Sequence, residues 1–261
     1  SSSYNPPDNI LAKYPQWAGR DRDGNILKKN GFTWLNGFHP EVQQFVLELI
    51  QEVIERYKVD GIQGDDRLPA LPSSGGYDDY TVSVYRKEHN GENPPYDYKN
   101  PSWLKWRADK LSDFGGRLYQ MVKTHNPNLI VSLSPSIYPW SLEEYLQDWP
   151  EWIRRGQVDM VHPQAYRYEI ERYKNTIDEM IRESGLDLKA RKIILAPGIL
   201  IKAGPRFNDP TYVKQALRYN REKGLHGEVF FFYEGLFEQN QYLADSLRAS
   251  FYKKSVLFPR K

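Results

Sequence analysis

The chain of 261 residues contains no cysteine. This absence excludes a disulfide-stabilised scaffold, a thiolate metal site and a cysteine nucleophile. Histidine is also scarce: the five residues form no H-x-H or H-E-x-x-H pattern, so a histidine-based metal site is not expected. A site made of carboxylates alone stays open, and we predict no metal and no cofactor.

The sequence also lacks long hydrophobic runs and a charge excess. No apolar segment approaches the roughly 20 residues of a membrane-spanning helix, so we expect no membrane insertion. The N-terminal Ser-Ser-Ser-Tyr does not resemble a signal peptide. With 36 basic and 34 acidic residues and no dense basic cluster, a nucleic-acid partner is not expected. The oligomeric state cannot be predicted from these features.

What the chain does contain in excess is aromatic rings, 14% of all residues, with 19 tyrosines and 7 tryptophans. Amphipathic rings beyond the needs of a core often line binding surfaces, and the C–H faces of sugars stack on them. Ordinary packing is the alternative for each ring. The rings predicted to contact sugar follow strand ends and are Tyr138, Trp140, Tyr166, Tyr168 and Tyr233.

Hydrophobic periodicity predicts strands alternating with helices, the pattern of parallel βαβ units. The predicted strands are 59–64, 129–134, 158–162, 192–196 and 228–233. The predicted helices are 40–57, 103–125, 142–155, 170–183, 210–223 and 240–252. About five units fit either an open sheet or the later part of a (β/α)8 TIM-type barrel, in a single domain covering residues 1–261.

Polar residues gather where the predicted strands end, which is the edge at which α/β barrels place their active sites. The first predicted strand ends at two adjacent carboxylates, Asp65 and Asp66. Like charges this close raise one pKa, which suits acid/base catalysis. A solvated Asp-Asp turn is the alternative interpretation.

Four blocks of the sequence, in order, are similar to those of the bacterial glycoside-hydrolase-like family ten. They are 35–42 (LNGFHPEV), 57–66 (YKVDGIQGDD), 134–136 (SPS) and 158–166 (VDMVHPQAY). This resemblance implies a TIM-type barrel that hydrolyses glycosidic bonds, with peptidoglycan glycan strands as a candidate substrate. Members of the family begin about three strands earlier, so the resemblance implies the later part of a barrel. Gln63 stands where the family usually has histidine.

Residue roles follow from position along the strands. Alternation turns Gln63 and Asp65 toward the barrel axis, so Asp65 is the predicted catalytic carboxylate and Asp66 orients it or binds a sugar hydroxyl. Glycosidases usually need a second carboxyl group. Glu234 ends a later strand, and its aromatic neighbours are expected to exclude water and raise its pKa, which suits a general acid. A salt bridge at the rim is the alternative.

The remaining predicted substrate-binding residues are Ser134, His162 and Gln164, which lie at other strand ends and join Gln63 and the rings named above. A long connection, 67–101, is predicted to form a lid or a wall of the site. Together with these features, the resemblance to family ten implies an extracytoplasmic glycoside hydrolase acting on a bacterial polysaccharide.

Two other functions were considered. A non-catalytic carbohydrate-binding protein could keep the same scaffold and rings. A doubly wound α/β domain that binds a phosphorylated ligand is disfavoured, because no glycine-rich phosphate loop follows a strand.

Overall fold

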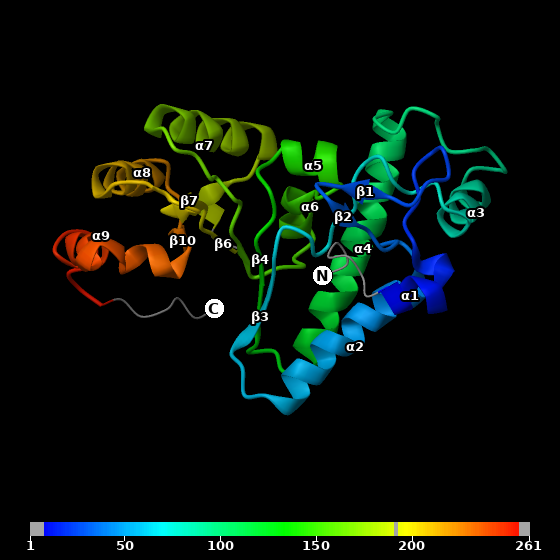
Figure 1. Cartoon of the computed structure of the whole chain (residues 1–261), viewed down its shortest axis with the longest axis horizontal. Helices are drawn as coiled ribbons and strands as arrows, with labels where there is room; N and C mark the ends of the chain where they lie inside the picture. The colour runs from blue at the N-terminus through cyan, green and yellow to red at the C-terminus, as the bar shows by residue number, and fades with distance from the viewer. Residues whose placement is uncertain (1–7, 191–192, 256–261) are drawn as a thin grey trace.

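A parallel sheet organises the protein, whose structure, a computed structural model, describes residues 8–190 and 193–255 (Figure 1). Four strands lie in the order β3-β4-β5-β6, all parallel. β7 and β10 form a second parallel pair, and a bridge between Gln164 and Gly198 links it to the end of β5. The strands are β3 (Gly61–Gly64), β4 (Ile130–Leu133), β5 (Met160–Val161), β6 (Ile194–Leu195), β7 (Gly198–Leu200) and β10 (Val229–Phe231).

This order confirms the predicted succession of parallel units and the later part of a TIM-type barrel; within the described residues the strands do not close into a complete barrel. The predicted strand 192–196 shortens to β6, and Lys192 lies outside the described residues. β7 was not predicted as a strand. The structure also contains two short antiparallel hairpins, each a separate two-stranded sheet. In one, β1 (Lys28–Lys29) pairs with β2 (Phe32–Thr33), and in the other β8 (Lys202–Ala203) pairs with β9 (Arg206–Phe207).

Several of the long helices begin where the sequence supplies a capping side chain followed by proline. Asn100 caps α4 and Asp209 caps α8, each by accepting hydrogen bonds from the first free backbone N–H groups. The helices are α1 (Asp8–Lys13), α2 (Pro40–Arg56), α3 (Asp79–Glu88), α4 (Pro101–His125), α5 (Trp140–Tyr145), α6 (Trp149–Arg154), α7 (Ile170–Ser184), α8 (Pro210–Glu222) and α9 (Glu238–Arg248). Short 3-10 turns occur at η1 (Pro15–Trp17), η2 (Leu188–Ala190) and η3 (Tyr233–Leu236).

The predicted single helix 142–155 is wrong, since two helices, α5 and α6, occupy this region. Leu146 adopts a left-handed backbone conformation with φ of 58°, which ends α5. Asp148 then caps α6 by accepting a hydrogen bond from the backbone N–H of Glu151. This break changes the direction of the chain within a segment whose apolar pattern alone predicts one continuous helix.

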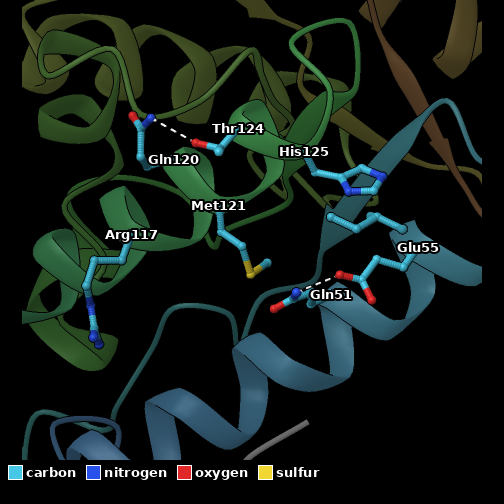
Figure 2. A pocket seen from close by; sticks show the side chains of 8 residues that line it. Gln51, Glu55, Arg117, Gln120, Met121, Thr124 and His125 are labelled. Atoms are coloured by element: carbon cyan, nitrogen blue, oxygen red, sulfur yellow. Dashed lines mark hydrogen bonds between the residues drawn. The ribbon is translucent and has the colours of Figure 1, made fainter.

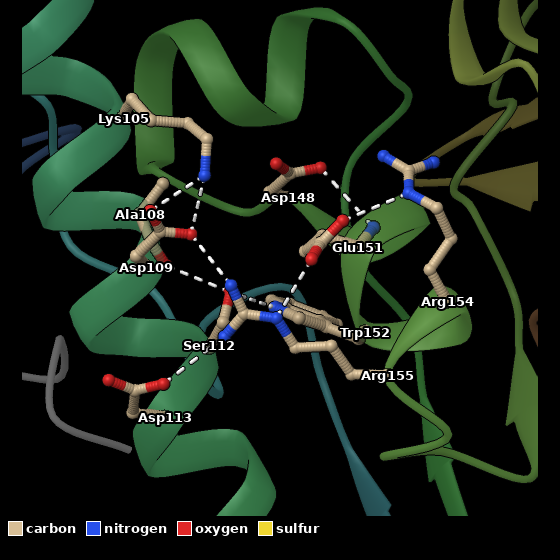
Figure 3. Close-up of polar contacts among 10 residues, drawn as sticks. All are labelled: Lys105, Ala108, Asp109, Ser112, Asp113, Asp148, Glu151, Trp152, Arg154 and Arg155. Carbon is tan, nitrogen blue, oxygen red and sulfur yellow. Dashed lines mark hydrogen bonds and ion pairs between the residues drawn. The ribbon is translucent and has the colours of Figure 1, made fainter.

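Polar contacts hold α6 against α4 (Figure 3). Arg155, just after α6, contacts Asp109 at 2.8 Å and Asp113 at 3.1 Å, both on α4. The buried indole N–H of Trp152 donates to the Ser112 hydroxyl at 3.0 Å. These contacts fix the connection between β4 and β5, whose ends contribute to the candidate site.

The helices pack on one face of the sheet only. One row of strand residues, Leu133, Val161 and Leu195, is buried in the core beneath the helices. Residues of the opposite phase point away from that core, and Gln63 and Phe231 are exposed there. Gln63 and Phe231 are therefore accessible on this face, whereas their paired neighbours Ser132 and Leu200 are buried.

Candidate functional site

The carboxyl ends of β3, β4 and β5 are joined by side-chain hydrogen bonds. Gln63 Nε2 donates to Ser134 Oγ at 3.3 Å, and Gln164 Nε2 donates to the Ser134 carbonyl at 2.9 Å. The structure thus brings together three of the predicted binding residues. Their shared edge lies on the accessible face of the sheet, because Gln63 is exposed and Ile62, its neighbour of opposite phase, packs against the helices.

Glycine at the start of β3 permits the close strand pairing that places this edge. A Cβ atom at Gly61 would overlap the backbone of Ile130 on β4. The register pairs Gln63 with Ser132 and Gly64 with Leu133. Any larger residue at this position would push β3 away from β4 and move the two aspartates that follow it.

Asp65 and Asp66 differ in environment although they are adjacent. The Asp65 side chain is 53% exposed and its Oδ1 accepts a hydrogen bond from the Arg67 backbone N–H at 2.9 Å. The Asp66 side chain is 34% exposed. Burial raises the pKa of Asp66; the Arg67 charge opposes this rise and the Asp65 charge adds to it. Burial therefore favours the protonated form of Asp66, which is one member of a carboxyl pair at a strand end.

Tyr166 lies near Asp66 across the site. Its ring stacks on Phe231 of β10 with centroids 4.8 Å apart. Burial raises the pKa of the Tyr166 hydroxyl, and the negative charge of Asp66 raises it further. Tyr166 consequently stays a neutral hydrogen-bond donor beside the carboxyl pair.

His162 is buried at the end of β5, with Nδ1 2.9 Å from the Ala196 carbonyl oxygen. Burial lowers the pKa of His162, and the hydrogen bond to Ala196 opposes the shift. The imidazole is therefore neutral at neutral pH, and because a carbonyl can only accept, Nδ1 carries the proton. This geometry fits a wall residue that orients its neighbours.

The other predicted rings are spread around the edge. Tyr138 is half-buried and packs against Trp149, whereas Trp140 is exposed and its ring contacts that of Tyr145. Tyr168 is exposed beneath the guanidinium of Arg206. Tyr233 is exposed and packs on Phe237. Trp140, Tyr168 and Tyr233 thus present ring surface to solvent, whereas Tyr138 mainly contributes to packing.

The expected dry environment of Glu234 is wrong. Its side chain is 62% exposed and forms an ion pair with Lys202 at 3.2 Å. The reason is local: β10 ends at Phe231, and the chain enters the turn η3, which turns Glu234 outward with Tyr233. Adjacency to aromatic residues in the sequence did not produce burial of this carboxylate.

Two residues that the sequence analysis missed organise the carboxyl pair. Arg67 contacts both aspartates. The fully buried Gln147 donates from Nε2 to the backbone carbonyl oxygens of Asp66 and Pro69, at 3.1 and 3.2 Å. Its Oε1 accepts from the Ser136 N–H, so this side chain ties the loop after β3 to the loop after β4. A glutamine 81 positions away carries no local sequence signal of this contact.

Within residues 8–190 and 193–255, no group of three or more His, Asp or Glu residues is arranged to hold a metal ion. No helix in the same ranges combines the length and apolar character needed to cross a membrane.

A cavity of about 460 Å³ lies elsewhere, between α2 and α4 (Figure 2). Glu55 is the one acidic residue among its lining side chains, and it accepts a hydrogen bond from Gln51 at 2.6 Å. The cavity therefore offers no carboxyl pair, in contrast to the end of β3. Its lining residues are Gln51, Ile54, Glu55, Arg117, Gln120, Met121, Thr124 and His125.

Comparison with known proteins identifies a family. The model of the family Glycosyl hydrolase-like 10 matches residues 3–214. The glycosyl hydrolase YngK of Bacillus subtilis (strain 168) is 21% identical, over 97% of this chain and 51% of YngK. The glycosyl hydrolase DigH of Escherichia coli (strain K12) is 26% identical, over 61% of this chain and 36% of DigH. The chain thus spans about half the length of the first relative and a smaller part of the second.

Solved structures agree on the fold. The glycoside hydrolase domain of PgaB (BpsB) from Bordetella bronchiseptica superposes with a TM-score of 0.69 and 17% identity. The match covers 89% of this chain and 68% of that domain. The β-galactosidase Gan42B from G. stearothermophilus gives a TM-score of 0.61 at 10% identity, over 88% of this chain and 40% of that enzyme. These matches establish the barrel fold of glycoside hydrolases.

Proposed function

Since the chain belongs to the Glycosyl hydrolase-like 10 family, we propose that it hydrolyses glycosidic bonds, with Asp65 and Asp66 as the catalytic carboxyl groups. The observation that carries this proposal is the unequal burial of two adjacent carboxylates at a strand end of a barrel fold. Different environments for two neighbouring acids are a usual basis for dividing acid and base roles.

In the proposed reaction Asp66 is the proton donor, because burial raises its pKa. Its carboxyl proton passes to the glycosidic oxygen as the bond to the anomeric carbon breaks. The more exposed Asp65 supplies negative charge near the positive charge that develops on the sugar ring. Water then adds to the anomeric carbon, which leaves a new reducing end and returns a proton to the site.

We propose that the substrate is a polysaccharide of the bacterial envelope. Peptidoglycan glycan strands are the first candidate to test. The support is the family and the exposed rings Trp140, Tyr168 and Tyr233, which suit a chain of sugars. Such a substrate would place the protein outside the cytoplasm, in the periplasm, on the envelope or secreted.

The test measures reducing ends released from peptidoglycan glycan strands by the purified chain and its variants. Asp65→Asn and Asp66→Asn should each lower kcat/KM by about two to four orders of magnitude. The matched control is Asp60→Asn, an exposed acid at the amino end of the same strand, which should leave the rate unchanged. An Asp66→Asn variant that folds normally and retains most of its turnover would remove Asp66 from the mechanism.

Glu234 enters the same experiment as a second acidic group of the site. Its exposure and its ion pair with Lys202 suit a rim residue better than a proton donor, so Glu234→Gln should change the rate less than about tenfold. A loss of two or more orders of magnitude with this variant would instead make Glu234 the general acid.

A non-catalytic carbohydrate-binding protein is the second candidate. It is favoured by Gln63, which cannot titrate where the family usually has histidine, and by the solvent-exposed pairing of Glu234. Glycan binding without release of reducing ends, unchanged by Asp65→Asn and Asp66→Asn, would support this alternative.

A further inference from the structure

Arg67 makes the closest positive contact with both aspartates at the end of β3. Its Nη1 lies 3.8 Å from Asp65 Oδ2, and its Nε lies 3.8 Å from Asp66 Oδ1. The Arg67 backbone N–H also donates to Asp65 Oδ1 at 2.9 Å. The side chain of Arg67 is only 26% exposed, so these contacts are partly shielded from solvent.

An aromatic ring from a distant segment holds this guanidinium. The Cζ atom of Arg67 lies 4.7 Å from the ring centroid of Phe32, in the hairpin formed by β1 and β2. Arginine stacks on rings in this way, and its planar fork keeps a fixed direction toward its anionic partners.

The hairpin is itself anchored to α5. Lys29 Nζ contacts Glu144 Oε2 at 2.7 Å, and Asn30 Nδ2 donates to the Tyr145 hydroxyl at 2.8 Å. The orientation of the Arg67 guanidinium is therefore set by elements outside the loop that carries the two aspartates.

From this geometry we infer that Arg67, braced by Phe32, is the positioning residue that holds the Asp65 and Asp66 carboxyl groups in fixed relation to each other. The inference rests on the proposed function of the pair, and it assigns the β1–β2 hairpin a role in the site. Two neighbouring carboxylates repel each other whenever both are ionised, and a shared cation offsets this repulsion and holds both directed at one substrate. Lysine could supply the charge but not the fork or the stacking.

The groups that act on the protonation of Asp66 are few and identified. Burial raises its pKa, Arg67 lowers it, Asp65 raises it as a like charge, and a hydrogen bond with its own backbone lowers it. The hydroxyls of Tyr145 and Tyr166 also lie within range of its charge. Loss of the Arg67 charge should consequently raise the pKa of Asp66, while loss of the stacking alone should disturb geometry more than charge.

The experiment follows the carboxyl carbons of Asp65 and Asp66 by NMR during a pH titration of the full chain. In Arg67→Gln the Asp66 titration should move to higher pH than in the unmodified chain. Arg56→Gln is the matched control, since Arg56 forms an exposed ion pair with Glu52 near the C-terminal end of α2 and should shift neither carboxyl. Superimposable Asp66 titrations in Arg67→Gln and the unmodified chain would overturn the inference.

Kinetics with the glycan substrate separate positioning from charge. Arg67→Lys should lower kcat about tenfold or more with KM nearly unchanged, because the retained charge no longer has a fixed direction. Full kcat in Arg67→Lys would refute positioning by the fork. If the unmodified chain releases no reducing ends but the NMR titration still moves in Arg67→Gln, the electrostatic contact is supported and the proposed hydrolysis alone fails.

Discussion

Burial acts in opposite directions on two ionisable side chains of the strand ends. It raises the pKa of Asp66 and lowers the pKa of His162, so both groups are pushed toward their neutral forms. The neutral imidazole donates to the Ala196 carbonyl, and the neutral carboxyl can donate a proton to substrate. Burial therefore favours the uncharged form of a side chain at each of these two strand ends, and the proton-donor role proposed for Asp66 depends on this shift.

The lowered pKa of His162 predicts a pH-dependent stability. In the unfolded chain the imidazole titrates near its usual value of about 6.5, so below that pH the unfolded state binds a proton that the folded state resists. The His162 contribution to stability should be complete above about pH 6.5 and should fall as the pH drops toward its lower folded value. Urea unfolding at about pH 7.5 and about pH 5.5 measures this loss.

His162→Asn is the matched variant, because the asparagine amide can keep the hydrogen bond to Ala196 without titrating. Between the two pH values, the unmodified chain should lose more unfolding free energy than this variant. Buried carboxyls such as Asp66 and Asp148 contribute in the opposite sense, but equally in both proteins. Equal losses in the two proteins would exclude His162 as the source.

Some contacts of single residues could be predicted from the sequence and others could not. The alternation of β3 correctly predicted that Gln63 faces the accessible side and that Ile62 faces the helices. The contacts of Arg67 with Phe32 and of Gln147 with Asp66 join segments brought together only by tertiary packing. Local pattern carries no information on such pairs. The catalytic roles of Asp65, Asp66 and Glu234 stay predictions.

Among the larger elements, the connection 67–101 is held to α4 by one buried arginine. The Arg107 side chain donates to the backbone carbonyl oxygens of Gly75 at 2.6 Å and Tyr98 at 2.5 Å, and also to that of Ser73. Its guanidinium lies 4.4 Å from the ring centroid of Trp103. Burial lowers the pKa of Arg107 to about 9, so the group still carries its charge at neutral pH. These contacts attach the connection to α4, and its role as a lid or a wall of the site stays a prediction.

Arg107→Met should therefore destabilise the fold by about 3 kcal/mol or more, since it leaves several buried carbonyl groups without a donor. Denaturant unfolding gives this value directly. Lys105→Met serves as the control on the same helix, because Lys105 forms only an exposed ion pair with Asp109, and it should cost less than about 1 kcal/mol. Similar unfolding midpoints for the two variants would mean that the stability of the connection 67–101 does not depend on Arg107.

On the scale of the whole molecule, the sequence predicted the succession of units because parallel strands and amphipathic helices leave strong periodic patterns. β3, β4, β5, β6 and β10 fall within the predicted strand ranges. The short strand β7, the two hairpins and the break between α5 and α6 were not predicted. Each depends on one or two backbone conformations, such as that of Leu146, and these leave no periodic signal.

The exposed edges of this sheet predict self-association. Within the described ranges 8–190 and 193–255, β3 pairs with β4 alone and β10 with β7 alone. On α2 the exposed side chains Leu49 and Val53 lie one turn apart, and the exposed Tyr57 follows directly after the helix; these three form the apolar stripe. Open strand edges and contiguous apolar surface both favour contacts between copies of a chain. The mass measured by light scattering should consequently rise with protein concentration.

Leu49→Lys should weaken this association by replacing an apolar side chain of the stripe with a charged one. Gln44→Lys is the control, because it adds the same charge to an exposed position of α2 without removing apolar surface. The mass of the control should rise with concentration as in the unmodified chain, whereas that of Leu49→Lys should rise less. If the unmodified chain keeps the mass of a monomer throughout, the open edges and the stripe do not cause self-association. If Leu49→Lys and Gln44→Lys reduce it equally, net charge rather than the stripe controls it.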